Sequence, residues 1–433
     1  MKKNWLIISH AYNMDGRAAS QTITDKIPFL LSAGINIQVL SAKTGTKDSV
    51  VQHTQLFPWG PSAFRFDFRH YIGLRFGKGF LYRVLTGFLG LVLAPLIFLE
   101  KILIGFSSQW SWFMPATLGA VWRVLFGRVD LVYTTGGAWS AHLAGWVVKS
   151  LTNVTWIVEI HDPLVFSSDE HKKNIGSYRD LAMQEWLESK IASAADLVWW
   201  FTKGAYESAC NRYPRLIRNG FYVLPGVQEP KGDLGNYKKR SHLSFSHFGS
   251  LSDTRSLQPF LMALDRFFKK YPESLSQCYV DIYGSDLDDI SKKYIESSDL
   301  KSLVRLHGRI EFDANSGLSG RDQILRKMHE SDVLLLMHGD SDWCSEYIPS
   351  KVYEYFYANR PVLAITHLNP ELDEMVAVRG GYVAQVTKQG SIDSAIKAAF
   401  HEWSTGKVFE SLCPPISVDL CVNAILRRVD DIR

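Results

Sequence analysis

The residues of this chain best suited to chemistry lie between Glu346 and Glu354. Within this segment Pro349 and Ser350 predict the start of a helix, because proline suits a first helical turn and serine is a good N-cap. The amides that follow, at Lys351 and Val352, would lack partners within the helix. Together with the positive end of the helix dipole, they would form a seat for a diphosphate.

Two carboxylates flank this helix start, eight positions apart. Glu354 could accept hydrogen bonds from the hydroxyls of a ribose, and Glu346, in the loop before the helix, could face a sugar beyond the phosphates. Glutamates at this spacing also occur by chance on surface helices. The preceding run Ser331–His338 favours a binding site. It is typical of a buried parallel strand, and open α/β sheets bind ligands in the loops after such strands.

A second group of polar side chains follows another apolar run, Val154–Ile160. His161 and Asp162 come directly after it, and Pro163 holds Asp162 in an extended conformation. His161 could hydrogen-bond a transferred sugar, and Asp162 could orient that sugar or act on an acceptor hydroxyl. The alternative is that Asp162 and Pro163 only make a turn.

The strand, the loop with Glu346, the Pro349–Glu354 helix start and the following Arg360–Ala364 resemble the donor site of GT-B glycosyltransferases. The most similar group is the retaining enzymes, group 1 or family 4-like, that build bacterial cell-surface polysaccharides. The resemblance covers nearly the whole chain. It implies an α/β fold with two Rossmann-like domains facing a cleft, a nucleotide-sugar as substrate, and sugar transfer with retention.

The resemblance also implies roles for residues outside this segment. Gly16, in the turn after the first strand, would close against the donor phosphates and the acceptor. Arg255 would contact the diphosphate, since a guanidinium binds phosphate bidentately and stays charged. The family pattern also has a lysine a few residues later, but Ser256–Phe260 contains none, and Lys351 could substitute. An ordinary turn glycine and a surface arginine remain the alternatives.

Asp340 and Asp342 form a DxD pattern, which in GT-A enzymes holds a divalent cation on a diphosphate. In this chain the pattern occurs late, beside a helix start that would bind the diphosphate without metal. Two carboxylates in a polar loop are also commonplace. We therefore expect no metal and no other cofactor, with the nucleotide-sugar bound as a substrate.

The segment from about residue 60 to 115 is rich in basic and aromatic residues. Its uncharged run, Gly87–Leu99, is interrupted by Pro95 and is shorter than the ~20 residues of a spanning helix. Such a segment suits the interface of an anionic membrane, and Trp110 and Trp112 could anchor it there. The alternative is a pair of ordinary core helices inserted in the first domain.

Length and composition describe a globular protein of two domains: 433 residues, 46% hydrophobic and 21% charged. The net charge of +4 is too weak to imply nucleic acid. The five cysteines form no CxxC pair, which argues against a zinc site or a disulfide framework. The apolar start of the chain is too short for a signal peptide. We therefore expect a cytoplasmic protein attached peripherally to the inner face of the membrane.

Strand and helix patterns alternate along the whole chain. They predict strands over Trp5–Ser9, Ile35–Leu40, Asp130–Thr134, Val154–Ile160, Asp196–Thr202, Tyr222–Pro225, Leu243–Phe248, Tyr279–Tyr283, Val304–Gly308, Val333–Met337 and Val362–Ile365. We expect an acceptor-binding domain over 1–227, a linker over 228–241, a nucleotide-sugar-binding domain over 242–410, and a tail over 411–433. The tail would cross back to the first domain as a helix.

The sequence thus predicts a glycosyltransferase that moves a hexose from a nucleoside-diphosphate sugar to a sugar acceptor, one carried on a lipid, in surface polysaccharide or glycan synthesis. One alternative is a sugar-nucleotide epimerase or hydrolase of the same fold, against which the basic and aromatic segment argues. The other is a non-catalytic binding subunit of a polysaccharide assembly complex, against which the pair of donor carboxylates argues.

Overall fold

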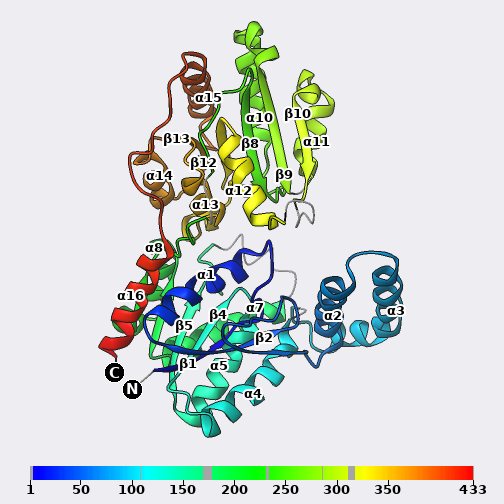
Figure 1. Ribbon diagram of the computed structural model, residues 1–433, viewed down its shortest axis with the longest axis vertical. Helices are drawn as coiled ribbons and strands as arrows, with labels where there is room; N and C mark the ends of the chain where they lie inside the picture. The colour runs from blue at the N-terminus through cyan, green and yellow to red at the C-terminus, as the bar shows by residue number, and fades with distance from the viewer. Residues whose placement is uncertain are drawn as a thin grey trace. The chain divides into compact units, whose positions relative to one another are not determined.

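The computed structural model describes residues 3–107, 109–168, 178–230, 234–284, 286–310 and 317–432 (Figure 1). They form two compact units. The first unit contains the residues up to Gln228 together with those from Ser417 on, and the second is Glu229–Ile416. Residues 234–241 of the predicted linker belong to the second unit, and residues 231–233 lie outside the described residues.

The first unit is built on a seven-stranded parallel sheet in the order β3-β2-β1-β4-β5-β6-β7. Its strands are β1 (Asn4–Ile8), β2 (Asn36–Ala42), β3 (Gln52–Leu56), β4 (Leu131–Gly136), β5 (Thr155–Ile160), β6 (Leu197–Trp200) and β7 (Gly220–Tyr222). All residues of β4 are buried, as a strand covered by helices on both faces requires. The strand order reverses between β1 and β4, which is the point where doubly wound sheets bind ligands.

Helices cover both faces of this sheet. They are α1 (Ala18–Ser32), α2 (Pro61–Phe76), α3 (Phe80–Leu103), α4 (Phe113–Phe126), α5 (Trp139–Thr152), α7 (Tyr178–Ala194), α8 (Lys203–Arg212), α9 (Leu216–Asn219) and the C-terminal α16 (Val418–Asp431). The buried face of α16, which includes Val422 and Ile425, packs into the same apolar cluster as Ile23 and Ile27 of α1. The last helix of the chain therefore belongs to the core of the first unit.

Two helices of the first unit form a hairpin, α2 and α3, which extends to one side of the sheet (Figure 1). The turn Gly77–Gly79 joins them, and they pack along each other. Pro95 was predicted to interrupt the apolar run, but α3 continues through it, so that prediction was wrong. By length and composition α3 is the one helix among the described residues that could cross a membrane.

The second unit is built on a six-stranded parallel sheet in the order β10-β9-β8-β11-β12-β13. Its strands are β8 (Leu243–Gly249), β9 (Cys278–Gly284), β10 (Val304–Gly308), β11 (Val333–Met337), β12 (Val362–Thr366) and β13 (Tyr382–Gln385). Its helices are α10 (Gln258–Lys270), α11 (Asp289–Glu296), α12 (Gly320–Glu330), α13 (Lys351–Tyr357), α14 (Pro370–Ala377) and α15 (Gln389–Ser404). Here the strand order reverses between β8 and β11.

Candidate functional site

The second unit gathers most of the predicted donor residues at the carboxyl ends of β8 and β11, the two strands where its order reverses. Arg255 follows β8, and Glu346 and the start of α13 follow β11. In doubly wound sheets this is the edge that binds ligands. The predicted strands and loops therefore bring these residues to one edge of one sheet.

The loop after β8 holds Arg255 in a defined position. The backbone of Arg255 pairs with Ser252, and its amide donates to the Ser252 carbonyl at 2.8 Å. The guanidinium donates to the hydroxyl of Ser250 at 3.2 Å. The side chain is only partly buried. Its positive charge is therefore fixed near the strand end while part of the side chain stays accessible to solvent.

The loop after β11 approaches the loop after β8 closely. Gly339 has φ = +123°, and a Cβ at this position would lie 2.9 Å from the carbonyl oxygen of Thr254. Only glycine fits such a position without moving the neighbouring backbone. Within the same loop the Tyr347 hydroxyl donates to the His338 carbonyl, and Asn369 donates to the Tyr347 carbonyl at 2.9 Å. The loop that carries Glu346 is thus tied at both ends.

Glu346 ends a short 3₁₀ helix, η4 (Asp342–Glu346), and is only 3% exposed. The structure places it in a buried position, whereas Asp340 and Asp342 of the DxD pattern are exposed. Among the residues that the structure describes, no three His, Cys, Asp or Glu side chains gather as a metal site would require.

The start of α13 differs from the prediction. Ser350 is the N-cap residue, but its side chain makes no capping hydrogen bond. The amide of Val352 donates to the Pro349 carbonyl at 3.0 Å, and that of Tyr353 donates to the Ser350 carbonyl at 3.3 Å. The prediction that the Lys351 and Val352 amides lack partners is therefore wrong for Val352. The helix begins with a tighter turn that satisfies this amide.

Glu354 lies between two cations. Its carboxylate accepts from the Lys351 ammonium at 2.6 Å, and Arg321 Nε of α12 is 3.4 Å away. Glu354 is 8% exposed, whereas Lys351 is partly exposed. Arg321 was not predicted as a site residue, because it lies in the first turn of α12 outside any recognisable motif.

Two buried histidines, His247 and His338, lie at this edge of the sheet, and nearby positive charges contribute to lowering their pKa values. Burial, with smaller contributions from the charges of Arg255 and Lys351, lowers the pKa of His247, in β8, to about 4, although a hydrogen bond with the Leu335 carbonyl acts in the opposite direction. Burial also lowers the pKa of His338 to about 4, with His367 and Arg255 contributing. Arg255 and Lys351 both act on His247, so both charges lie near the carboxyl end of β8. Such a concentration of positive charge suits an anionic group.

The corresponding edge of the first unit carries His161 and Asp162 after β5. His161 is partly buried, and its Nε2 lies 2.8 Å from Glu159 Oε1 and 3.0 Å from the Thr135 hydroxyl. Asp162 is exposed. His161 is therefore oriented by the strands on which it stands, and Asp162 extends from the same edge into solvent.

The carboxylate that holds His161 is the centre of a buried network that the sequence analysis missed. Glu159 is fully buried and lies 2.9 Å from the equally buried Lys26 of α1. Tyr133 and Trp199 donate to the same carboxylate at 2.8 and 3.0 Å. Burial alone would raise the pKa of Glu159, but Lys26 and His161 outweigh it and lower that pKa. A glutamate inside the apolar run Thr155–Ile160 was the available signal.

Gly16 lies in the exposed loop that follows β1, with φ = +67°. The beginning of that loop packs against the hairpin. His10 Nε2 is 3.5 Å from a carboxylate oxygen of Asp67 in α2, and both side chains are buried. The loop that carries Gly16 is therefore supported at its start by α2.

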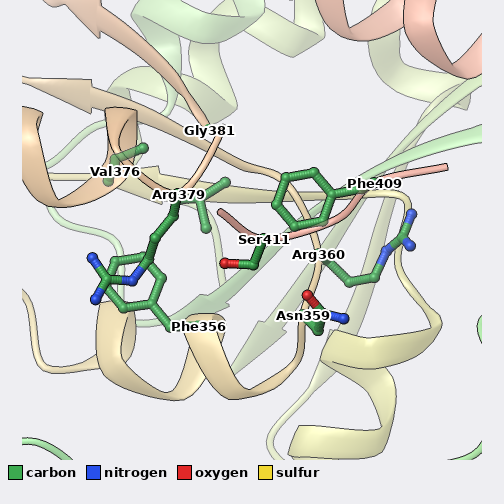
Figure 2. Close-up of a pocket in the computed structure, with 9 residues that line it drawn as sticks. Phe356, Asn359, Arg360, Val376, Arg379, Gly381, Phe409 and Ser411 are labelled. Atoms are coloured by element: carbon green, nitrogen blue, oxygen red, sulfur yellow. The ribbon is translucent and has the colours of Figure 1, made fainter. Parts of the chain in front are cut away.

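A surface hollow in the second unit involves none of these residues (Figure 2). Phe356, Arg360, Arg379 and Phe409 are among its lining residues. Its empty volume is 230 Å³, open solvent included, and ligand pockets usually hold about 300–1,000 Å³. Both arginines donate to backbone carbonyls beside it. We assign this hollow to packing.

Two doubly wound parallel units, with the last helix of the chain packed on the first unit, define the GT-B fold. Solved structures with this arrangement include Anabaena HepE in complex with UDP, which is 13% identical with a TM-score of 0.57 and 100% of both chains covered. A UDP-forming α,α-trehalose-phosphate synthase from Burkholderia xenovorans is 10% identical with a TM-score of 0.59, covering 100% of this chain and 99% of the other.

A UDP-N-acetylglucosamine 2-epimerase is also similar, at 12% identity and a TM-score of 0.52, covering 99% of this chain and 96% of the other. No protein-family model matches the sequence, and no curated protein matches it. At these identities the comparisons establish the fold. The structural similarity thus confirms the GT-B fold predicted from the sequence.

Proposed function

We propose that this protein is a glycosyltransferase that moves a hexose from a nucleoside-diphosphate sugar to a sugar acceptor. The observation that carries the proposal is a pair of cations at the carboxyl edge of the second sheet: Arg255 lies in the loop after β8, and Lys351 begins α13 after the neighbouring β11. Fixed cations at a strand end of an open α/β sheet suit a diphosphate and stabilise it as it leaves. Similar structures that contain UDP support the same assignment.

In this proposal the donor is held mainly by the second unit. Arg255 and Lys351 bind the diphosphate, together with the backbone at Ser350. The Val352 amide takes part only by exchanging its bond to the Pro349 carbonyl for a phosphate oxygen. Glu354 binds the ribose, and for that the carboxylate must exchange part of its contact with Lys351 for the ribose hydroxyls. Glu346 faces the transferred sugar.

The first unit contributes the acceptor side of the reaction. His161, held by Glu159, contacts the sugar, and Asp162 acts on the acceptor hydroxyl or orients it. Gly16 allows the loop after β1 to approach the phosphates. Retention of configuration is part of the proposal, and it is supported by the resemblance of the donor segment alone.

We propose a lipid-linked acceptor and peripheral attachment to the inner face of the cell membrane, with surface polysaccharide or glycan synthesis as the pathway. The exposed apolar and basic hairpin α2–α3 supports this location. We also propose that no metal takes part, because the cations near β8 can neutralise the diphosphate. Activity should then survive EDTA; loss of activity on chelation, and in an Asp342→Asn variant, would favour the DxD alternative.

Thermal unfolding with a panel of nucleoside diphosphates and their sugars tests the donor site directly. A ligand at about a hundred times its dissociation constant should add ~2.7 kcal/mol to the free energy of unfolding. Stabilisation by one base, and further discrimination among its sugars, is the expected result. If no nucleoside diphosphate stabilised the protein, the proposal would be wrong.

The similarity to a UDP-N-acetylglucosamine 2-epimerase supports one alternative, an enzyme that acts on the nucleotide-sugar without an acceptor. Product analysis separates the two. An epimerase or hydrolase would convert the donor when it is incubated alone, whereas a transferase would consume it appreciably only when an acceptor is added.

A further inference from the structure

We propose that the hairpin α2–α3 is inserted in one leaflet of an anionic membrane, with α3 lying along the interface and not crossing it. This inference deepens the proposed function, because it specifies how the membrane would be contacted, and it rests on that function only for the lipid-linked acceptor.

Helix α3 exposes apolar side chains around most of its circumference. Phe80 is 79% exposed and Leu91 is 75% exposed. The other large hydrophobic residues exposed on the hairpin are Leu74, Phe76, Leu81, Val84, Phe88, Val92, Leu96, Phe98, Leu99, Ile102 and Leu103. Gly90 is the only described α3 residue that is buried. Soluble proteins rarely expose such a continuous apolar surface, and one flat protein partner would cover only one side of it.

The basic and acidic side chains of the hairpin lie on different sides: the basic ones face solvent and the acidic ones face the rest of the first unit. Its basic side chains are all exposed: Arg65, Arg69, Arg75, Lys78, Arg83 and Lys101. Its two acids, Asp67 and Glu100, are turned inward. Asp67 is fully buried beside His10, and Glu100 accepts from Trp110 Nε1 at 2.6 Å and from the Ser62 amide at 2.9 Å. The outer surface is therefore cationic and matches an anionic leaflet. Two copies of this surface would repel each other.

Helix α3 is long enough to span a membrane, since 24 residues extend about 36 Å at 1.5 Å per residue. Its attachment argues against crossing. Arg179 donates to the carbonyls of Ile102 and Leu103, at 3.0 and 2.7 Å, and so holds the end of α3 to the first unit. A crossing α3 would also carry α2 with it, and the charges of Arg65 and Arg69 would enter the hydrocarbon core.

The same hairpin supports the loop that begins at the end of β1. Asp67 of α2 approaches His10, and the ring of His10 packs edge-on against Trp112 at 5.4 Å between centroids. A hairpin lying in the interface would therefore hold the carboxyl edge of the first sheet near the membrane surface. On the proposed function, that edge receives the lipid-linked acceptor.

Flotation of the full chain with vesicles tests the inference. We expect flotation with phosphatidylcholine vesicles containing phosphatidylglycerol, and none with phosphatidylcholine alone. Leu91→Ser should weaken binding about tenfold, because a leucine buried in the interface would be lost. Leu412→Ser, in the second unit, is the matched control, since Leu412 is 74% exposed, and it should float like the wild type. Equal losses in both variants would overturn the inference.

Variants that neutralise single cations separate the electrostatic contribution to membrane binding from the apolar contribution. Arg75→Gln, Lys78→Gln and Arg83→Gln should each weaken binding about fivefold at low salt, from ~1 kcal/mol per cation. Equal flotation of the wild type on neutral and anionic vesicles would remove the electrostatic argument. The oligomeric state in solution is the last check. If the wild type were a dimer without vesicles and Leu91→Ser were a monomer, the apolar surface of α3 would bind a second copy of the chain, and the inference of membrane insertion would be wrong.

The orientation of α3 is tested with a Lys78→Cys variant in a Cys413→Ser background. Lys78 lies in the turn of the hairpin, and the other cysteines are buried. With protein added outside the vesicles, an in-plane hairpin leaves this thiol reactive to a membrane-impermeant maleimide. Protection that only detergent removes would show crossing and overturn the inference. In solution, nucleoside diphosphates should stabilise Leu91→Ser against unfolding as much as they stabilise the wild type. This measurement tests the donor site separately from membrane binding.

Discussion

The carboxyl edges of the two sheets differ in whether their charged side chains are buried or exposed to solvent. In the first unit, Lys26 and Glu159 are fully buried, and the carboxylate is further bonded by Tyr133, Thr135 and Trp199. In the second unit, Arg255 and Lys351 are partly exposed, and the neighbouring His247 is kept neutral by burial. The charges of the first edge are buried and paired with one another. The second edge presents partly exposed cations, Arg255 on the Ser250 hydroxyl and Lys351 paired with Glu354.

This difference indicates a division of labour. A buried ion pair whose partners are all present fixes the orientation of its neighbours but has little left for a ligand. Partly exposed cations on fixed loops retain most of their interaction energy until an anion arrives. We therefore expect substitutions of the buried pair Lys26 and Glu159 to affect folding mainly, and substitutions of Arg255 or Lys351 to affect ligand binding mainly.

The largest expected effect is on folding stability. Glu159→Gln removes the negative charge and leaves Lys26 buried without its counter-ion, which should lower the free energy of unfolding by about 3–5 kcal/mol. Denaturant titration measures this. Glu330→Gln is a control, since Glu330 pairs with Lys327 on the surface, and it should cost at most ~1 kcal/mol. The double variant Glu159→Gln, Lys26→Met should recover part of the lost free energy of unfolding, because no unpaired charge remains buried. If Glu159→Gln and Glu330→Gln were equally stable, the buried ion pair would not stabilise the fold as expected.

The second expected effect is on the pH dependence of stability. His247 has a folded-state pKa of about 4, below the usual 6.5, so the unfolded state binds the proton more readily between these values. Its contribution is complete above pH 6.5 and is lost as the pH falls towards 4. In His247→Gln, the stability difference between pH 7.5 and 4.5 should shrink by about 2–3 kcal/mol. An unchanged difference would mean that His247 titrates normally in the folded protein.

Most of the fold could be predicted from the sequence because the central strands are short, apolar and fully buried. The predicted Val333–Met337 agrees with β11, and Trp5–Ser9 is one residue from β1. Two strands were missed. The edge strand β3 has the polar sequence Gln-His-Thr-Gln-Leu, which carries no apolar run. The strand β13 has only four residues and lies at the other sheet's edge.

The donor segment was recognisable because its residues are close in sequence. The Lys26–Glu159 pair was not, because it joins α1 to β5 and depends on donors from β4 and β6. Such a contact exists only after the sheet has formed. Arg321 beside Glu354 is another contact between separate elements, and no local pattern marks it.

The third expected effect is on donor binding. Arg255→Ala should weaken binding of the stabilising nucleoside diphosphate by about 1.5–3 kcal/mol, the range for hydrogen bonds to charged groups. Isothermal titration calorimetry measures it. Unfolding should be nearly unaffected, because the guanidinium is partly exposed and donates to the hydroxyl of Ser250 in an exposed contact. Arg266→Ala is the matched control, since Arg266 pairs with Asp393 between α10 and α15 and should not change nucleotide affinity.

The smallest expected effects distinguish the two glutamates of the second edge. Glu354→Gln keeps the shape of the side chain but removes its charge, so it should weaken nucleoside diphosphate binding by about 1 kcal/mol, as expected for a lost hydrogen bond. Glu346→Gln should leave nucleoside diphosphate binding unchanged and lower turnover of the sugar donor, because the buried Glu346 is proposed to face the sugar.

Glu354 holds Lys351 at 2.6 Å, so Glu354→Gln also releases a cation towards the diphosphate. If that release dominated, affinity for the diphosphate would rise and affinity for the nucleoside without phosphate would fall. Titrating both ligands separates a ribose contact from an effect on Lys351. Equal losses of diphosphate affinity in Glu346→Gln and Glu354→Gln would move Glu346 away from the sugar and place both carboxylates at the nucleotide.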